Sequence, residues 1–299
     1  MQINGVMIED TFAEAFPMRA TRVIVTASEP RWARTAAQAL TGFATSVIAC
    51  GCEAGIEREL EPDETPDGRA GIAILLFAMG DQDLARQLQN RVGQCVLTCT
   101  GTACFSGLDG DGQAPLGRAL RYFGDGFQFS KRLGGKRYWR IPVMDGEFLI
   151  EDTAGVASGV GGGNFLILAT TGEAARAAAE AAVEAMRRLP NIVLPFPGGI
   201  VRSGSKVGSR YKGLIASTND AFCPTIRAQT SRSVLPPEVE AVLEIVIDGL
   251  TEADVAEATA VGVRAACALG RKGGVVGISA GNYGGQLGPY HFHLHRVLS

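Results

Sequence analysis

One order of segments occurs in both halves of this chain and constrains its fold more than any other feature. In each half an apolar segment, an amphipathic helix and a second apolar segment follow one another, and then the same order is repeated. The first half predicts strands at residues 22–27, 46–50, 72–77 and 95–98, with helices at 30–40 and 81–92. The second half predicts strands at residues 165–169, 192–194, 243–247 and 275–278, with helices at 173–188, capped by Thr171, and at 251–269.

This repeated order predicts an α+β fold in which each half is a ferredoxin-like unit, β-α-β-β-α-β, so that the chain is a duplication with Gly-rich inserts. We expect two lobes, residues 1–150 and 151–299, which meet near residues 147–155. A chain of 299 residues with 46% apolar residues is large enough to bury two such cores.

Composition and charge exclude several classes of protein. No run of apolar residues approaches the ~20 that a membrane helix needs, and the N-terminus lacks the basic-then-apolar layout of a signal peptide. We therefore expect a cytoplasmic protein. A net charge of −3 and a pI near 5.7 provide no basic face for a nucleic acid.

The seven cysteines are odd in number and lie mostly in apolar runs, which is typical of reduced core thiols rather than of a disulfide framework. Cys95 and Cys99 are the only pair at a spacing close to that of metal ligands. No second pair completes a zinc site, so we expect no metal bound by cysteine.

Four Gly-rich segments lie outside the regular scheme, at residues 101–126, 155–163, 195–208 and 281–288. A single segment of this kind is more often a turn than a binding site, because glycine is common in turns. Four of them in one chain favour a ligand cleft that backbone amides approach closely.

Residues 195–206 combine prolines, glycines, two hydroxyls and one ammonium, a composition that predicts a cradle for an anion or an amide. The spacing is not that of a P-loop or a dinucleotide fingerprint, so the segment names no nucleotide. A structural turn is the alternative interpretation. The residues expected to contact substrate here are Pro197, Gly198, Gly199, Ser203, Ser205 and Lys206.

All three histidines lie together, at His291, His293 and His295. On a strand, the period of two would place their imidazoles on one face, which is compatible with a zinc site that keeps an open fourth position. A half-exposed terminal strand with polar residues outward is the alternative, because no carboxylate that would orient the imidazoles is visible nearby.

Glu244 is an acidic residue in the middle of an apolar strand, where a carboxylate is costly unless it is paired or has a chemical role. Its side chain points either into a cleft or into water, since a solvated strand face has the same alternation. Glu53, Glu57 and Asp125 are weaker candidates for the same role.

Several long segments together resemble the formylmethanofuran:tetrahydromethanopterin formyltransferase family, and they extend over essentially the whole chain. They are Asn4-Gly5-Val6, residues 8–17, Thr45-Ser46-Val47-Ile48, residues 53–57, Gly93-Gln94-Cys95-Val96-Leu97-Thr98, Phe123-Gly124-Asp125-Gly126, residues 195–206 and residues 278–285.

The resemblance implies an enzyme without metal or permanent cofactor that is built of two ferredoxin-like lobes, forms dimers or tetramers and binds both carriers in a cleft. Such an enzyme moves a formyl group between tetrahydromethanopterin and methanofuran, reversibly and without an acyl-enzyme. The resemblance also implies substrate contacts by Gln94, Asn282 and Tyr283. It implies a catalytic role for Glu244, because the family has an acidic residue in this strand. His291 and His293 depart from the family pattern, in which only the final Leu-His is expected.

Bacterial relatives resemble subunits of a formyltransferase/hydrolase complex in methylotrophs, in which the formyl group passes from the pterin to the furan carrier before hydrolysis. We expect that direction and those hydrolase partners, with Arg19, Arg22, Arg202 and Arg210 either meeting an acidic carrier tail or lying on a solvated surface. The alternatives are a zinc hydrolase built on the histidines and a non-catalytic scaffold subunit.

Overall fold

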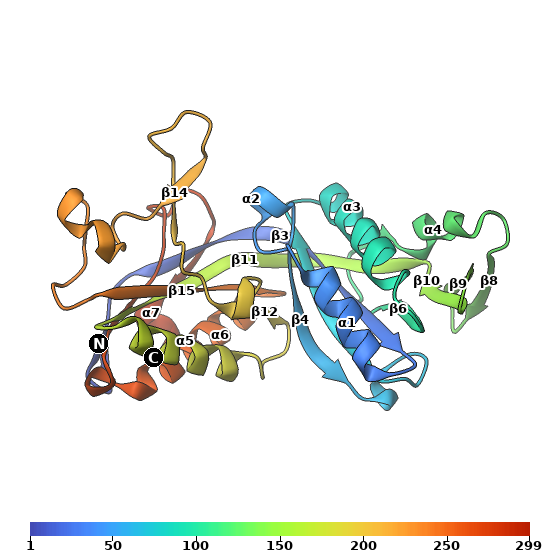
Figure 1. The fold of residues 1–299 in the computed structure, drawn as a ribbon, viewed down its shortest axis with the longest axis horizontal. Coiled ribbons are helices and arrows are strands. Elements are labelled where there is room, and N and C mark those ends of the chain that lie inside the picture. Colours follow the sequence, from blue (N-terminus) through green and yellow to red (C-terminus); the bar gives the residue numbers. More distant parts are fainter. The chain divides into compact units, whose positions relative to one another are not determined.

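The computed structural model describes residues 1–299 and divides into two compact units (Figure 1). We call residues 18–159 the central unit, and residues 1–17 together with 160–299 the terminal unit, because it contains both chain ends. Two long strands, β3 (Phe12–Ala27) and β11 (Thr153–Ala169), each begin in one unit and end in the other. Residues 1–17 therefore belong to the same compact unit as residues 160–299, whereas a division at residue 150 places them in different lobes.

The central unit contains a sheet of seven strands in the order β4-β5-β3-β6-β10-β9-β8, in which only the pair β6 and β10 is parallel. The new strands are β4 (Glu53–Leu60), β5 (Gly71–Ala78), β6 (Thr102–Ser106), β8 (Phe129–Leu133), β9 (Lys136–Val143) and β10 (Gly146–Glu151), and β7 (Gly112–Pro115) pairs with the start of β11. The helices are α1 (Pro30–Thr41), α2 (Val47–Cys50), α3 (Asp81–Arg91) and α4 (Gly117–Leu120).

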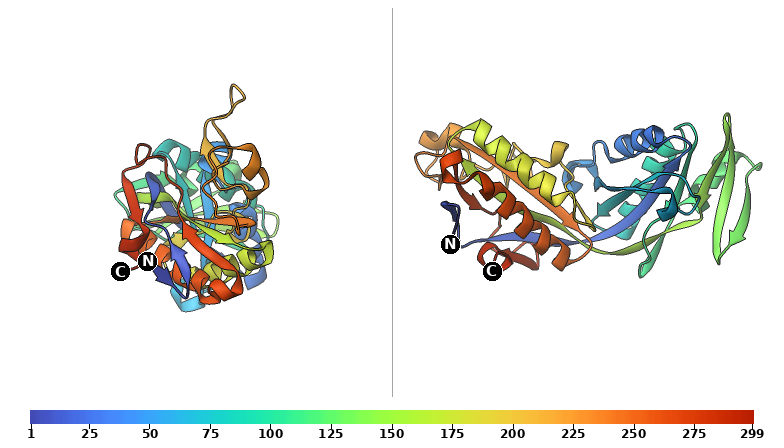
Figure 2. Two further views of the ribbon diagram at one scale, coloured as in Figure 1. Left: turned by 90° about the vertical axis from the view of Figure 1, so that its left-hand side faces the viewer. Right: turned by 90° about the horizontal axis from the view of Figure 1, so that it is seen from below.

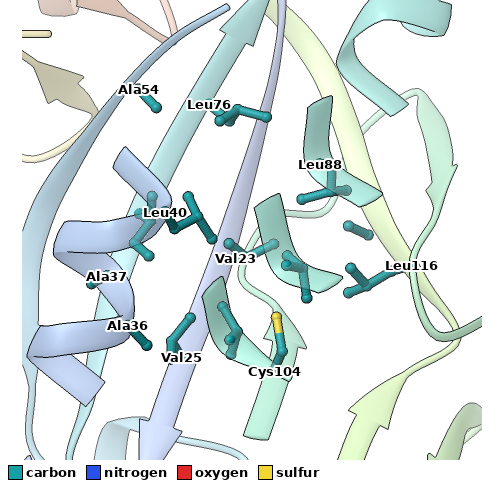
Figure 3. Packing of buried hydrophobic residues seen from close by; sticks show 14 of the residues in the cluster. Val23, Val25, Ala36, Ala37, Leu40, Ala54, Leu76, Leu88, Cys104 and Leu116 are labelled. Carbon is teal, nitrogen blue, oxygen red and sulfur yellow. The ribbon is translucent and has the colours of Figure 1, made fainter. Parts of the chain in front are cut away.

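The core of the central unit lies between its sheet and the helices α1 and α3. Ala36, Ala37 and Leu40 recur at helical spacing on α1 and are all buried. They pack toward Val23 and Val25, which alternate on one face of β3 (Figure 3). Alternate residues of β5, among them Ile74 and Leu76, face the same core.

The terminal unit contains a mixed sheet in the order β1-β2-β16-β11-β15-β12. Its strands besides β11 are β1 (Gln2–Ile3), β2 (Val6–Ile8), β12 (Ile192–Val193), β15 (Ala241–Gly249), β16 (Val275–Ser279) and β17 (Tyr290–His293), which pairs with the start of β3. Its helices are α5 (Gly172–Met186), α6 (Glu252–Ala266) and α7 (Leu294–Val297). Helices α5 and α6 lie side by side along the sheet (Figure 2), and β13 (Ser205–Val207) and β14 (Ala216–Thr218) form a hairpin that projects from the unit.

Most predicted elements are present, including α5, whose first turn is capped by the Thr171 hydroxyl. Two predicted strands are wrong. Residues 47–50 form the short helix α2, and residues 92–96 form a π-helical turn after α3. The strands that follow α1 and α3 are β4 and β6, which lie a few residues further along the chain. None of the helices is both long enough and apolar enough to cross a membrane.

Candidate functional site

Glu244 lies in the middle of β15, where its side chain is mostly buried. The strand is held on one side by β11, with Glu244 opposite Leu166. On the other side the backbone of Glu244 exchanges two hydrogen bonds with Val201, at N···O distances of 2.7 and 2.9 Å. Burial raises the pKa of Glu244 to about 7. A carboxyl group with this pKa both takes up and releases a proton near neutral pH.

A cavity of about 310 Å³ lies beside Glu244. It is lined by segments of the terminal unit that include residues 201–204 and 240–244. Ser203, one of the residues expected to contact substrate, lines this cavity, whereas the turn at residues 197–199 does not. The second half of the predicted cradle adjoins the carboxyl group, and the Pro-Gly-Gly turn does not.

Tyr283 lies close to Glu244 and Ser205, so three of the predicted residues come together in one place. Burial raises the pKa of Tyr283, and the nearby Glu244 carboxylate raises it further, while a side-chain hydrogen bond with Ser205 partly offsets this. The phenol therefore keeps its proton at neutral pH, so its O–H is available as a hydrogen-bond donor. Its ring lies near that of Phe16, with the ring centroids 6.4 Å apart.

Asn282 shapes the loop that carries Tyr283. Its side-chain amide donates to the Thr11 hydroxyl and to the Phe12 carbonyl, both at 3.2 Å, and its oxygen accepts from the amide of Gly284. The same loop surrounds Glu14, a fully buried carboxylate that was not predicted from the sequence. The signal that selects Glu244, an acidic residue among apolar ones in a strand, is also present at Glu14.

Three consecutive backbone amides, from Gly199 to Val201, form hydrogen bonds inside the protein at the Pro-Gly-Gly turn, where the sequence predicts an amide nest. Gly199 donates to the carbonyl of Phe196 at 2.8 Å, Ile200 to that of Pro197 and Val201 to that of Glu244. Gly198 and Gly199 both have positive φ angles, 67° and 83°, which explains the glycines by turn geometry.

The ammonium group of Lys206 is paired within the chain. Its Nζ lies 2.6 Å from Oδ1 of Asp220, whose other oxygen accepts hydrogen bonds from Thr230 and Arg232. These partners, with Lys206 the foremost, lower the pKa of Asp220 to about 2. Lys206 therefore meets an anionic ligand only in competition with Asp220.

The remaining candidate acids, and Gln94, lie in the central unit. Gln94 is exposed in the π-helical turn. Glu53 accepts a hydrogen bond from the amide of Val47, and Glu57 forms a buried pair with Arg22 through two contacts of 2.6 Å. Asp125 is exposed at a positive φ of 49°. Glu53 and Glu57 thus have structural partners that Glu244 lacks.

The histidines do not share one strand face as predicted. His291 and His293 lie on β17, but the chain turns into α7 at Leu294, so His295 belongs to a helix. His295 contacts the carbonyl of Ile8 at 2.9 Å. No group of three or more His, Cys, Asp or Glu side chains among residues 1–299 is arranged to hold a metal ion.

All seven cysteines are free thiols, and three of them, Cys52, Cys104 and Cys267, are buried. Burial raises the pKa of Cys104 and Cys267, as expected for core thiols. Cys223 differs, because it lines the cavity beside Glu244.

Three further cavities are larger and do not contain Glu244. Two of them, of about 570 and 390 Å³, lie in the central unit, and one of about 640 Å³ lies beside the β13–β14 hairpin and includes Arg210. Arg202 is exposed and lines the Glu244 cavity. Arg19 pairs with Asp81 and Asp111, so it lacks the free charge that a carrier tail would require.

Comparison with known proteins covers the whole chain. Residues 1–143 match the family model described as formylmethanofuran-tetrahydromethanopterin formyltransferase, and residues 146–297 match the one described as FTR, proximal lobe. A formylmethanofuran–tetrahydromethanopterin formyltransferase from Methylococcus capsulatus is 67% identical over the full length of both chains. One component of the formyltransferase/hydrolase complex from Methylorubrum extorquens is 57% identical, over 99% of this chain and 97% of that one.

Solved structures give the same result. The crystal structure of the formyltransferase/hydrolase complex from Methylorubrum extorquens with methylofuran contains a chain that superimposes with a TM-score of 0.97 at 56% identity, covering 100% of this chain and 99% of that one. The formyltransferase from Methanosarcina barkeri superimposes with a TM-score of 0.93 at 47% identity, covering 99% of this chain and all of that one. The chain belongs to the formylmethanofuran–tetrahydromethanopterin formyltransferase family.

Proposed function

We propose that this chain transfers a formyl group between tetrahydromethanopterin and methanofuran, with Glu244 as the group that carries the proton. The observation that carries the proposal is a carboxyl group with a pKa of about 7 beside a cavity, close to the hydroxyls of Ser205 and Tyr283. The relatives bearing this enzyme name, at identities up to 67%, support the choice of substrates.

The reaction needs a proton to leave one nitrogen and reach another. The amine of methanofuran attacks the formyl carbon, its N–H proton passes to the Glu244 carboxylate, and the carbonyl becomes an oxyanion. The bond to the pterin nitrogen then breaks, and Glu244 returns the proton to that nitrogen. A donor such as the Tyr283 hydroxyl stabilises the oxyanion. Both carriers are cosubstrates in one ternary complex, so no acyl-enzyme forms.

The experiment is to compare turnover of the wild type and of Glu244→Gln, which keeps the shape and removes titration. Turnover should fall by about 10²–10⁴-fold while the KM values for both carriers change little. Glu257→Gln, an exposed carboxyl group on α6, is the matched control. Wild-type turnover in Glu244→Gln would make Glu244 structural and return the role to Glu53, Glu57 or Asp125. Absence of transfer by the isolated wild-type chain would favour a scaffold subunit.

The fold is proposed to be a duplication of two ferredoxin-like lobes at residues 1–150 and 151–299. The support is the strand order, which is β6-β3-β5-β4 across the sheet of one unit and β16-β11-β15-β12 across that of the other. Along the chain, α1 and α5 follow the first of the four strands, β3 and β11. Helices α3 and α6 follow the third, β5 and β15, so the two units have the same connections.

The chain is proposed to act in the cytoplasm as a dimer or tetramer that associates with hydrolase subunits, in the direction from the pterin to the furan carrier. The support is the likeness to a component of the Methylorubrum extorquens formyltransferase/hydrolase complex. Mass measurement of the native complex, purified through a tag on this chain, tests both the oligomer and the association. A monomer without companions would contradict them.

A further inference from the structure

Glu14 is completely buried, yet its carboxylate accepts four hydrogen bonds from one loop. Its Oε2 accepts from the amides of Tyr283 and Gly285, at 2.7 and 2.9 Å. Its Oε1 accepts from the amide of Gly288 at 2.7 Å and from that of Leu287. The loop is thus folded around a single side chain that comes from a strand at the other end of the sequence.

The close approach of the loop to β3 requires its glycines. A Cβ at Gly288 would lie 2.1 Å from the carbonyl oxygen of Ala15, and Gly284 and Gly285 both have positive φ angles. The start of the loop is held separately, because the side chain of Asn164 accepts from the amide of Gly281 at 2.7 Å.

The Glu14 side chain is ionised in the folded protein. Burial by itself raises its pKa, but the four backbone donors together more than offset burial, so the pKa of Glu14 lies below its ordinary value. An ionised carboxylate is required by the geometry, since only it offers two oxygens that both accept and neither donates. A glutamine would turn an NH₂ group toward two of the four N–H donors.

We propose that Glu14 is a positioning residue for formyl transfer, whose carboxylate fixes the loop at residues 283–288 and thereby holds the Tyr283 hydroxyl beside Glu244 and Ser205. This rests on the proposed role of Glu244. The first of the four amides that Glu14 binds belongs to Tyr283 itself. The backbone N–H held by Glu14 and the phenol are therefore parts of one residue. Displacement of the loop moves the donor away from the oxyanion.

The test compares Glu14→Gln, Tyr283→Phe and the double variant, with Asp10→Asn as the control for removing a nearby exposed carboxylate. Turnover should fall by about 10- to 100-fold in each single variant, because small displacements of a positioned group have effects of this size. The KM values for the carriers should change much less. The double variant should lose no more than the single ones, because Glu14 acts through Tyr283.

Hydrogen exchange distinguishes positioning from general stabilisation. In Glu14→Gln the amides of residues 283–288 should lose protection while those of α5 and α6 keep it. Unchanged turnover, or losses that add in the double variant, would overturn the proposal. If Glu14→Gln does not fold, Tyr283→Phe decides alone: it should keep loop protection and lose turnover, and wild-type turnover would overturn the proposal. Failure of the Glu244 assignment shows up separately, as wild-type turnover in Glu244→Gln with the loop still protected.

Discussion

Two carboxyl groups of the terminal unit, Glu14 and Glu244, have opposite pKa shifts because of their hydrogen-bond partners. Both are removed from water, which disfavours the ionised form. Four backbone N–H groups replace water as hydrogen-bond donors to Glu14 and lower its pKa, whereas burial is the only cause of the raised pKa of Glu244. One group therefore stays ionised and holds a loop, and the other titrates near neutral pH.

The pH dependence of turnover should report this difference. Glu244 takes a proton from the attacking nitrogen, so it must begin ionised, and kcat of the wild type should fall as the pH drops below about 7. Glu244→Gln should lack this limb. The measurement is kcat with saturating carriers between pH 5 and 9, and a wild-type profile flat through pH 7 would contradict the assignment.

The thiol of Cys223 allows a direct test of transfer without an acyl-enzyme, because it lines the same cavity as Glu244. Cys223→Ala should leave turnover largely intact, since transfer directly between the two carriers needs no thiol and the lost Sγ costs only packing. Cys95→Ala, far from β15 in sequence and packed in the central core, should do the same. Intact-protein mass spectrometry during turnover should detect no formyl group on Cys223. A formylated thiol would refute the direct mechanism.

At the scale of elements, periodic segments were predictable and short apolar runs were not. Helices α1, α5 and α6 have apolar residues at helical spacing and start signals, so their positions follow from local sequence. The run at residues 46–50 has neither periodicity nor enough length to separate a strand from a helical turn, and it is the helix α2. The residue pair Glu244 and Tyr283 comes together through strand pairing, which no local pattern contains.

The turn at residues 197–199 offers a matched pair of glycine variants. A side chain at Gly199 would put its Cβ 2.9 Å from the side chain of Val183, so Gly199→Val should destabilise the protein by roughly 1–3 kcal/mol through overpacking alone. Lowered activity in that variant would therefore not identify a cradle.

Gly198 is exposed, and a side chain there would meet nothing within 4 Å. Gly198→Asn should keep stability in urea unfolding, because asparagine tolerates a positive φ. A raised KM for either carrier in this variant would indicate that the turn approaches substrate. Unchanged kinetics would limit the cradle to residues 201–206.

At the scale of the whole molecule, the sequence predicts two repeated units but not which terminus belongs to which. The grouping of residues 1–17 with the second half depends on the pairing of β2 with β16 and of β17 with β3, contacts between the two ends of the chain. Such distant pairings leave no periodic signal in either partner. Glu14, in this same segment, could not be connected to Tyr283 for that reason.

The buried carboxyl group of Glu244 also has a thermodynamic cost to folding. Its pKa of about 7 lies above the value of about 4.3 for an exposed Glu. Below that lower value Glu244 is neutral in both the folded and the unfolded chain, so its burial does not reduce the free energy of unfolding through ionisation. As the pH rises from that lower value through 7, the free energy of unfolding falls, by up to roughly 4 kcal/mol. Relative to the wild type, Glu244→Gln should therefore gain free energy of unfolding between pH 5 and pH 9, measured by urea titration at each pH. If the variant and the wild type differ in free energy of unfolding by the same amount at pH 5 and at pH 9, ionised Glu244 is well solvated. The proton carrier would then not destabilise the folded enzyme.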